Sequence, residues 1–129
     1  MACRSHILVV EDDPLVSEVV LAALEDFYQT SCAETAAAAL ERLCAGGIDA
    51  MLLDCTLPGG LDPQLIPKAD EIGVPIILMS GHPEMLDSVP GAPRPFILKP
   101  FSLASLLTAV EQVMLNDSRR VASDRAAPP

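Results

Sequence analysis

The sequence has almost no aromatic side chains and little positive charge. Aromatic residues make up 3% of the 129 residues, so a core has to be built from Leu, Val, Ile, Ala and Met. Lys and Arg number 8 against 18 Asp and Glu, which gives a formal net charge of -10. A field of that sign repels nucleic acids and anionic membranes. We therefore expect neither as a partner, and instead expect cations or basic protein surfaces.

Long apolar runs and metal-type cysteine spacings are also lacking. No run approaches the roughly 20 apolar residues that span a bilayer, and the N-terminus lacks the order of a signal peptide. The four cysteines show neither CxxC nor zinc-ligand spacing, which favours reduced packing residues. Cys55 follows Asp54, but no nearby base would activate it as a nucleophile. These features predict a cytoplasmic protein, and its length suits one domain.

Short apolar runs alternate with helical patterns along the chain. Apolar runs and one more polar run predict five strands, at residues 6–10, 28–33, 48–53, 74–79 and 96–98. Apolar residues at helical spacing predict regular helices, at residues 14–26, 35–45 and 103–114. Two further helices are expected to be short or irregular because prolines interrupt them, at residues 63–72 and about 83–89.

This alternation predicts an α/β fold of the flavodoxin-like (βα)5 type, a doubly wound parallel sheet with strand order 2-1-3-4-5. One domain is expected over residues 5–115. The polar segment 116–129 ends in Ala-Ala-Pro-Pro and is expected to be a disordered tail.

Four of the five predicted strands end in polar side chains. Glu11 and Asp12 follow the first strand, Asp54 ends the third, Ser80 the fourth and Lys99 the fifth. In the predicted order the first and third strands are neighbours, and sites in such sheets lie beyond the carboxyl ends of the strands. Three carboxylates meeting there would repel one another unless a cation lay between them.

These residue types suit phosphoryl chemistry at a magnesium site. Mg²⁺ takes one or two carboxylates together with phosphate oxygens, and Lys99 and Ser80 would complete a phosphoryl pocket as a charge and a hydroxyl donor. Asp54 is then the candidate nucleophile, because carboxylates form aspartyl-phosphates. Structural interpretations remain open, since an acid such as Asp13 caps a helix, Ser80 suits a turn and Lys99 can be a solvated charge.

Four segments at these strand ends resemble the marks of response regulator receiver domains, the phosphoacceptor parts of two-component systems. The segments are residues 9–14, 52–59, 78–81 and 98–101. The resemblance covers roughly residues 5–115. It implies that Asp54 accepts a phosphoryl group from a histidine kinase or a phosphotransfer protein. It also implies that Mg²⁺ is held by Glu11, Asp12, Asp54 and the backbone carbonyl of Thr56.

The resemblance further assigns a conformational switch. Ser80 would move toward the phosphoryl group, Lys99 would pair with that group, and the Lys99–Pro100 bond would be cis. Phe96 falls where the family keeps an aromatic switch residue, although it is also a candidate core residue. The protein would signal to an unknown protein partner as a stand-alone, single-domain receiver. It would be a monomer or weak dimer, and no enzyme beyond slow autodephosphorylation.

Three other functions are alternatives to the one that this resemblance implies. A phosphatase of the haloacid dehalogenase type would need a second acid where Thr56 stands, and its nucleophile would follow the first strand. A flavodoxin-like FMN carrier is disfavoured because Glu11, Asp12 and Asp13 would repel phosphate. A pseudo-receiver that binds partners without phosphorylation is disfavoured by the complete set of acids.

Overall fold

The computed structural model describes residues 5–55, 64–82, 84 and 94–126, the segment 116–126 by its backbone alone. Five parallel strands form one sheet in the order β2-β1-β3-β4-β5. They are β1 (His6–Val10), β2 (Gln29–Ala33), β3 (Ala50–Asp54), β4 (Ile76–Ser80) and β5 (Phe96–Leu98). The predicted fold class and strand order are therefore confirmed.

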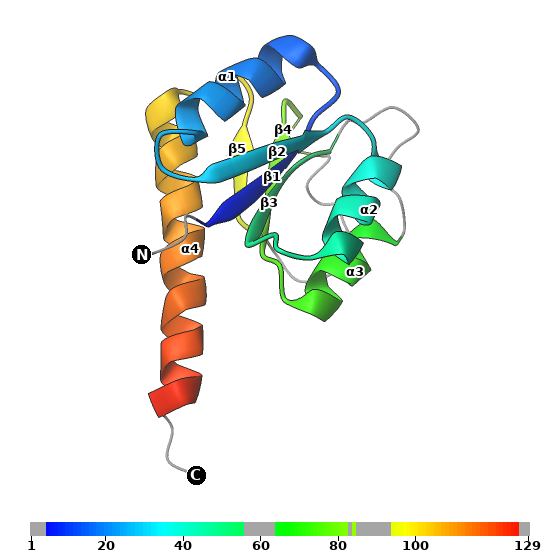
Figure 1. The fold of residues 1–129 in the computed structure, drawn as a ribbon. Coiled ribbons are helices and arrows are strands. Elements are labelled where there is room, and N and C mark those ends of the chain that lie inside the picture. The colour runs from blue at the N-terminus through cyan, green and yellow to red at the C-terminus, as the bar shows by residue number, and fades with distance from the viewer. Residues whose placement is uncertain (1–4, 56–63, 83, 85–93, 127–129) are drawn as a thin grey trace.

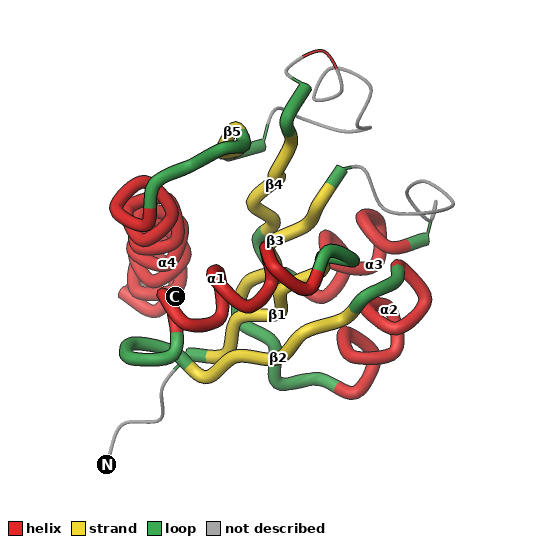
Figure 2. The backbone as a smooth tube through the Cα atoms, turned by 90° about the horizontal axis from the view of Figure 1, so that it is seen from above, coloured by secondary structure: helices red, strands yellow, loops and turns green. Residues whose placement is uncertain are grey.

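The described residues form four helices, which cover both faces of the sheet (Figure 1). They are α1 (Pro14–Leu24), α2 (Ala36–Ala45), α3 (Leu65–Ile72) and α4 (Leu103–Ala126). Seen from above, α1 and α4 lie on one side of the sheet and α2 and α3 on the other (Figure 2). The helix predicted at about 83–89 lies outside the described residues.

The period-two alternation of strand side chains divides the core into two halves. Leu8, Met51 and Leu53 point to the half that includes α2 and α3. Val9 and Leu52 point to the half that includes α1 and α4. Both halves are filled, so β3 and β4 are buried along their whole length, which explains why they read as continuous apolar runs. Burying one such side chain contributes about 1.5–3 kcal/mol.

Local capping fixes where the helices begin, and so where the loops leave the sheet. The Asp13 side chain accepts a hydrogen bond from the backbone N–H of Leu15 at 2.9 Å, directly before Pro14 opens α1. Thr35 Oγ1 accepts from the N–H of Ala38 at 3.1 Å in the same way for α2. Both caps lie at the carboxyl edge of the sheet, where β1 and β2 end.

The helix around Pro67 is short, as predicted, but it is not broken at that proline. Helix α3 begins at Leu65, which places Pro67 in its first turn, where backbone N–H groups have no partner within the helix. Because the helix begins this late, Pro67 costs it no hydrogen bond. Gly73, with a φ of 79°, ends α3 in the left-handed conformation that favours glycine.

The last helix continues past the point where the sequence predicted a disordered tail. Its backbone stays helical from Leu103 to Ala126, and its end projects beyond the sheet (Figure 1). The physical reason is local. Segment 116–126 contains neither Gly nor Pro, so no residue interrupts the helical backbone hydrogen bonds. Residues 127–129 lie outside the described residues.

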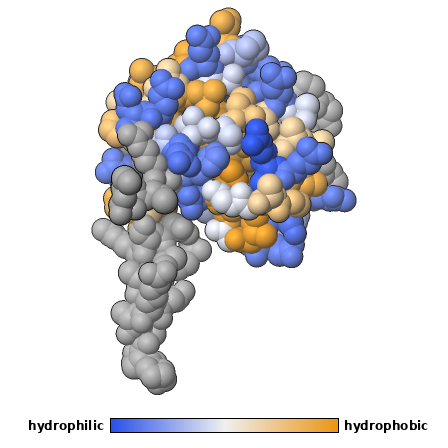
Figure 3. Space-filling view, viewed as in Figure 1, coloured by the Kyte–Doolittle hydropathy of each residue, from blue (hydrophilic) through white to orange (hydrophobic). Residues whose placement is uncertain are grey.

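The described surface is a mixture of hydrophilic and hydrophobic residues. Figure 3 shows separate hydrophobic patches among hydrophilic residues on one face. Within the described ranges, no helix is both long and apolar enough to cross a membrane.

Candidate functional site

Three carboxylates meet where β1 and β3 end. These strands are neighbours, with Val10 beside Leu53, so the acids that follow each strand reach the same edge of the sheet. One carboxylate oxygen from each of Glu11, Asp12 and Asp54 lies within 4.8 Å of the others. Glu11 and Asp54 are each 1% exposed, whereas Asp12 faces solvent. The sequence prediction that these three acids come together is thus met by the geometry.

Lys99 reaches this cluster from the end of β5. Its Nζ lies 2.6 Å from Oε1 of Glu11 and 3.4 Å from Oδ2 of Asp54. The backbone holds the residue in place, because the N–H of Lys99 donates to the carbonyl of Ser80 at 2.8 Å. The Lys99–Pro100 peptide bond is cis, as the resemblance implied.

Glu11 is fixed by the turn that joins β1 to α1. Its backbone N–H donates to the carbonyl of Ala33 at 3.0 Å, which extends the pairing of β1 with β2 by one residue. Its Oε2 accepts from the N–H of Asp12 at 3.1 Å. Glu11 therefore presents one oxygen to its own turn and the other to Lys99.

The cluster holds more negative than positive charge. Burial, together with the neighbouring Asp54, raises the pKa of Glu11 to about 7, and Lys99 only partly opposes this. Burial alone would lower the pKa of Lys99, but its two carboxylate partners outweigh burial and raise it, so the side chain stays an ammonium group. One ammonium cannot balance three carboxylates, two of them buried. This donor set fits a divalent, oxygen-liganded cation such as Mg²⁺.

Ser80 lies at the tip of β4 with its hydroxyl engaged in the following turn. The side chain is fully buried, donates to the carbonyl of His82 at 2.9 Å and accepts from the N–H of His82 at 3.0 Å. The turn interpretation of Ser80 therefore describes this structure. Contact with a phosphoryl group would require the hydroxyl to leave His82.

The remaining residues singled out from the sequence lie in different environments. Phe96 is 52% exposed and points away from the core, while Ile97 beside it is buried, so the core interpretation of Phe96 is wrong. Thr56 lies outside the described residues. Cys55 is buried, and burial, with Asp54 next to it, raises the pKa of its thiol to about 11. It is therefore a packing residue, as expected.

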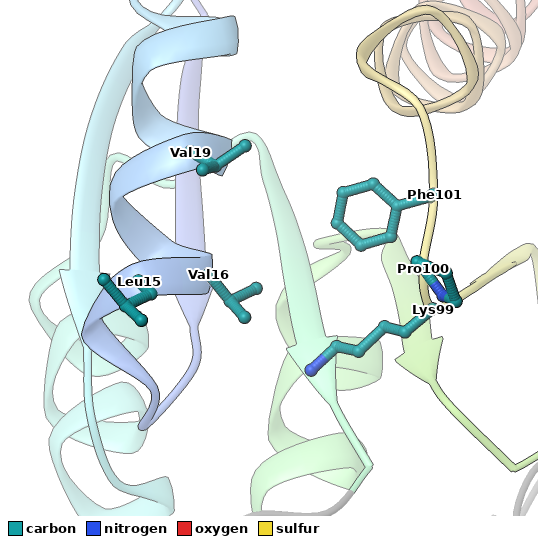
Figure 4. A pocket seen from close by; sticks show the side chains of 6 residues that line it. All are labelled: Leu15, Val16, Val19, Lys99, Pro100 and Phe101. Atoms are coloured by element: carbon teal, nitrogen blue, oxygen red, sulfur yellow. The ribbon is translucent and has the colours of Figure 1, made fainter.

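A largely apolar cavity of about 400 Å³ opens beside Lys99, between α1 and the loop that leads into α4 (Figure 4). It is lined by Leu15, Val16, Val19, Lys99, Pro100 and Phe101. Leu15 and Val19 are 72% and 51% exposed, although both belong to the apolar pattern of α1. The sequence indicates such exposure, because α1 carries more apolar residues than one buried face can accommodate.

Comparison with known proteins identifies the fold and the family. A family model for the response regulator receiver domain matches residues 7–111. The chain belongs to this family. The sheet described above, with acids at the ends of β1 and β3, is therefore that of a receiver domain of two-component systems.

Individual relatives agree with this assignment. The receiver domain is 32% identical over 130 residues to the transcriptional regulatory protein CseB of Streptomyces coelicolor, covering 97% of this chain and 56% of that protein. It is 32% identical to the solution structure of SdrG from Sphingomonas melonis, with a TM-score of 0.69, covering 86% and 97% of the two chains. A CheY-like receiver domain from Methanospirillum hungatei has the same fold, with a TM-score of 0.81, 24% identity and coverage of 91% and 98%.

The chain spans about half the length of the curated relatives it matches. A second one, the DNA-binding response regulator MtrA of Mycolicibacterium smegmatis, is 32% identical over 113 residues, which are 83% of this chain and 49% of that protein. The similarity therefore concerns the receiver part of these relatives.

Proposed function

We propose that the receiver domain accepts a phosphoryl group on Asp54 from the phosphohistidine of a histidine kinase or phosphotransfer protein. The observation that carries this proposal is the position of the Lys99 ammonium, which contacts Glu11 and Asp54 at the three-carboxylate cluster. A cation already placed beside the nucleophile is suited to pair with the incoming anionic group.

The transfer is a displacement at phosphorus. A carboxylate oxygen of Asp54 attacks, a P–O bond forms as the P–N bond breaks, and the imidazole, protonated on its other nitrogen, leaves as a neutral ring with the electron pair of the broken bond. Lys99 turns from Asp54 to the transferred group and offsets its charge. The domain is an acceptor in this scheme and not an enzyme that turns over an external substrate.

Glu11, Asp12 and Asp54, with the backbone carbonyl of Thr56, would hold Mg²⁺, which supplies charge neutralisation for the phosphoryl oxygens when bound. The chain's own contribution is placement. Glu11 is fixed between its own turn and Lys99, and the exposed Asp12 would be accessible to a hydrated cation.

Phosphorylation is read out by a switch in this proposal. Ser80 exchanges its hydrogen bonds to His82 for the phosphoryl group, which frees the turn after β4. Phe96 is exposed on β5, three residues before Lys99, and responds by changing its packing. A downstream protein partner in the cytoplasm then binds the altered surface.

The decisive experiment is phosphorylation by acetyl phosphate and Mg²⁺, followed by intact mass. The wild-type chain should gain one phosphoryl group, Asp54→Asn none, and EDTA should abolish the gain. Asp26→Asn, which changes an exposed acid in the turn after α1, is the matched control and should label like wild type. Equal labelling of Asp54→Asn would show that the acceptor is another residue.

A further inference from the structure

Arg94 and Asp70 form a two-pronged ion pair outside the acid cluster. Nη1 of Arg94 donates to Oδ1 of Asp70 at 2.9 Å, and Nη2 donates to Oδ2 at 2.7 Å. The fork of the guanidinium matches the carboxylate, a geometry that fixes orientation as well as distance. The Arg94 side chain is only 14% exposed, against 51% for Asp70. The hydrogen bonds from Arg94 also hold the pKa of Asp70 below its ordinary value.

The pair joins two parts of the chain that strand pairing does not connect. Asp70 belongs to α3, the next helix after the acceptor strand β3 in the described chain, and α3 packs mainly against α2. Arg94 lies just before β5, at the opposite end of that strand from Lys99. The ion pair thus ties the edge strand of the sheet to a helix on one of its faces.

Strand β5 has few other attachments. It is three residues long, lies at the edge of the sheet and pairs with β4 alone. Only Ile97 of its side chains is buried, because Phe96 and Leu98 are 52% and 41% exposed. Two further backbone bonds hold its ends, from Leu78 to the carbonyl of Pro95 at 2.9 Å and from Lys99 to that of Ser80 at 2.8 Å. A segment with so little buried apolar surface opens easily unless something else anchors it.

We propose that the Asp70–Arg94 pair is a positioning device for Lys99. It fixes the start of β5, and the strand transmits that placement over five residues, roughly 16 Å, to the ammonium beside Asp54. Without the pair, the hydrogen bonds between β5 and β4 open more often, and Lys99 spends less time in contact with the acid cluster. The consequence for phosphoryl transfer rests on the function proposed above, whereas the effect on β5 does not.

Backbone hydrogen exchange tests the effect on the strand directly. In Asp70→Asn the N–H groups of Lys99 and Leu78, which bond across the β4–β5 pair, should exchange about three- to fivefold faster than in wild type. The N–H groups of β1 and β3 should keep their rates. Arg94→Lys retains the positive charge but loses the two-pronged geometry. Its exchange rates at Lys99 and Leu78 should therefore lie between those of wild type and Asp70→Asn.

The matched control is Glu71→Gln. Glu71 is the neighbour of Asp70 on α3, and it pairs at 3.6 Å with Lys68 of the same helix, so its loss leaves β5 untouched. Exchange at Lys99 and Leu78 should then equal that of wild type. A uniform acceleration across all strands in Asp70→Asn, or no acceleration at β5, would overturn the proposal.

Labelling kinetics test the effect on chemistry. With saturating acetyl phosphate, the rate constant for phosphorylation should fall about threefold in Asp70→Asn, in proportion to the loosened strand. The Mg²⁺ concentration for half-maximal labelling should stay the same or fall, because the acids are untouched and a loosened Lys99 competes less for them. The reversed pair, Asp70→Arg with Arg94→Asp, should restore the wild-type exchange rates at Lys99 and Leu78 and the wild-type rate constant for phosphorylation. If wild type is not phosphorylated, only the proposed function is refuted. The hydrogen-exchange rates of β5 still test whether the Asp70–Arg94 pair positions the strand.

Discussion

The ammonium of Lys99 lies 2.6 Å from the buried carboxylate of Glu11, a residue 88 positions earlier in the chain. This contact joins the end of edge strand β5 to the end of central strand β1. It places a positive charge beside Asp54, which lies 3.4 Å from the same nitrogen. The acid cluster and the edge strand therefore act as one site.

Removing the Lys99 charge should slow phosphorylation more than it weakens metal binding. In Lys99→Ala we expect labelling by acetyl phosphate to fall about 100- to 1000-fold, because one positioned donor at developing charge contributes about that much. Mg²⁺ affinity should be kept or increased, since the ammonium no longer competes for Glu11 and Asp54. Calorimetric Mg²⁺ titration and intact-mass kinetics measure the two effects. Lys68→Ala, on α3, is the control, and an equal rate loss there would contradict the role of Lys99.

Asp12 offers a cleaner test of the metal site because it is exposed and its replacement leaves the core intact. Asp12→Asn should weaken Mg²⁺ binding at least about tenfold, since a hard cation prefers a charged carboxylate to an amide. The adjacent Asp13→Asn is the matched control, because Asn caps a helix as well as Asp does. Equal losses in both variants would indicate a general charge effect and no specific ligand.

The apolar cavity beside Lys99 leads to a prediction about the donor. A protein that brings its phosphohistidine to Asp54 has to cover the neighbouring surface, where Leu15 is 72% exposed. Leu15→Ser should therefore slow transfer from a phosphohistidine protein about tenfold, the loss expected for one buried apolar contact. Labelling by acetyl phosphate, which needs no such surface, should not change.

The control for this prediction is Ile72→Ser, at the end of α3. Ile72 is 44% exposed and lies outside the cavity lining, so its replacement should leave both reactions unchanged. A loss of transfer from the protein donor in Ile72→Ser would show that α1 is not the specific docking surface.

The parts of the structure that sequence could predict are those governed by local patterns. Strand β5 was located correctly at residues 96–98 because Pro95 and Pro100 bound a short apolar run. The convergence of Glu11 and Asp54 followed from strand order, which the alternation of strands and helices determines. Helix α4 extends beyond the predicted helix 103–114, because the polar segment 116–126 contains no residue that breaks a helix.

Contacts between side chains distant in sequence lay beyond such patterns. Nothing local to Arg94 indicates that it reaches Asp70, 24 residues away, because the contact depends on how α3 sits against the sheet. The exposure of Val19 depends on packing in the same way. Its helical spacing fits a core position, and only the actual packing of α1 against α4 decides which apolar residues stay outside.

The Asp70–Arg94 pair should make stability depend on pH in the acid range. Arg94 lowers the folded-state pKa of Asp70 below the ordinary value of 3.8. The pair's contribution to the free energy of unfolding is therefore fully present above pH 3.8 and is lost as pH falls through the lower, folded pKa. Because Asp70 is half exposed, the contribution stays below about 1 kcal/mol and shrinks at high salt.

Chemical denaturation of wild type and Asp70→Asn across this pH range measures the effect. The two stabilities should differ at pH 6 and converge as the pH falls below the lowered pKa of Asp70, where the wild-type carboxyl is protonated as well. Glu71→Gln corrects for the loss of one negative charge on α3, since Glu71 sits beside Asp70 without contacting Arg94. A difference between wild type and Asp70→Asn that stays constant with pH would mean that the ion pair does not stabilise the fold.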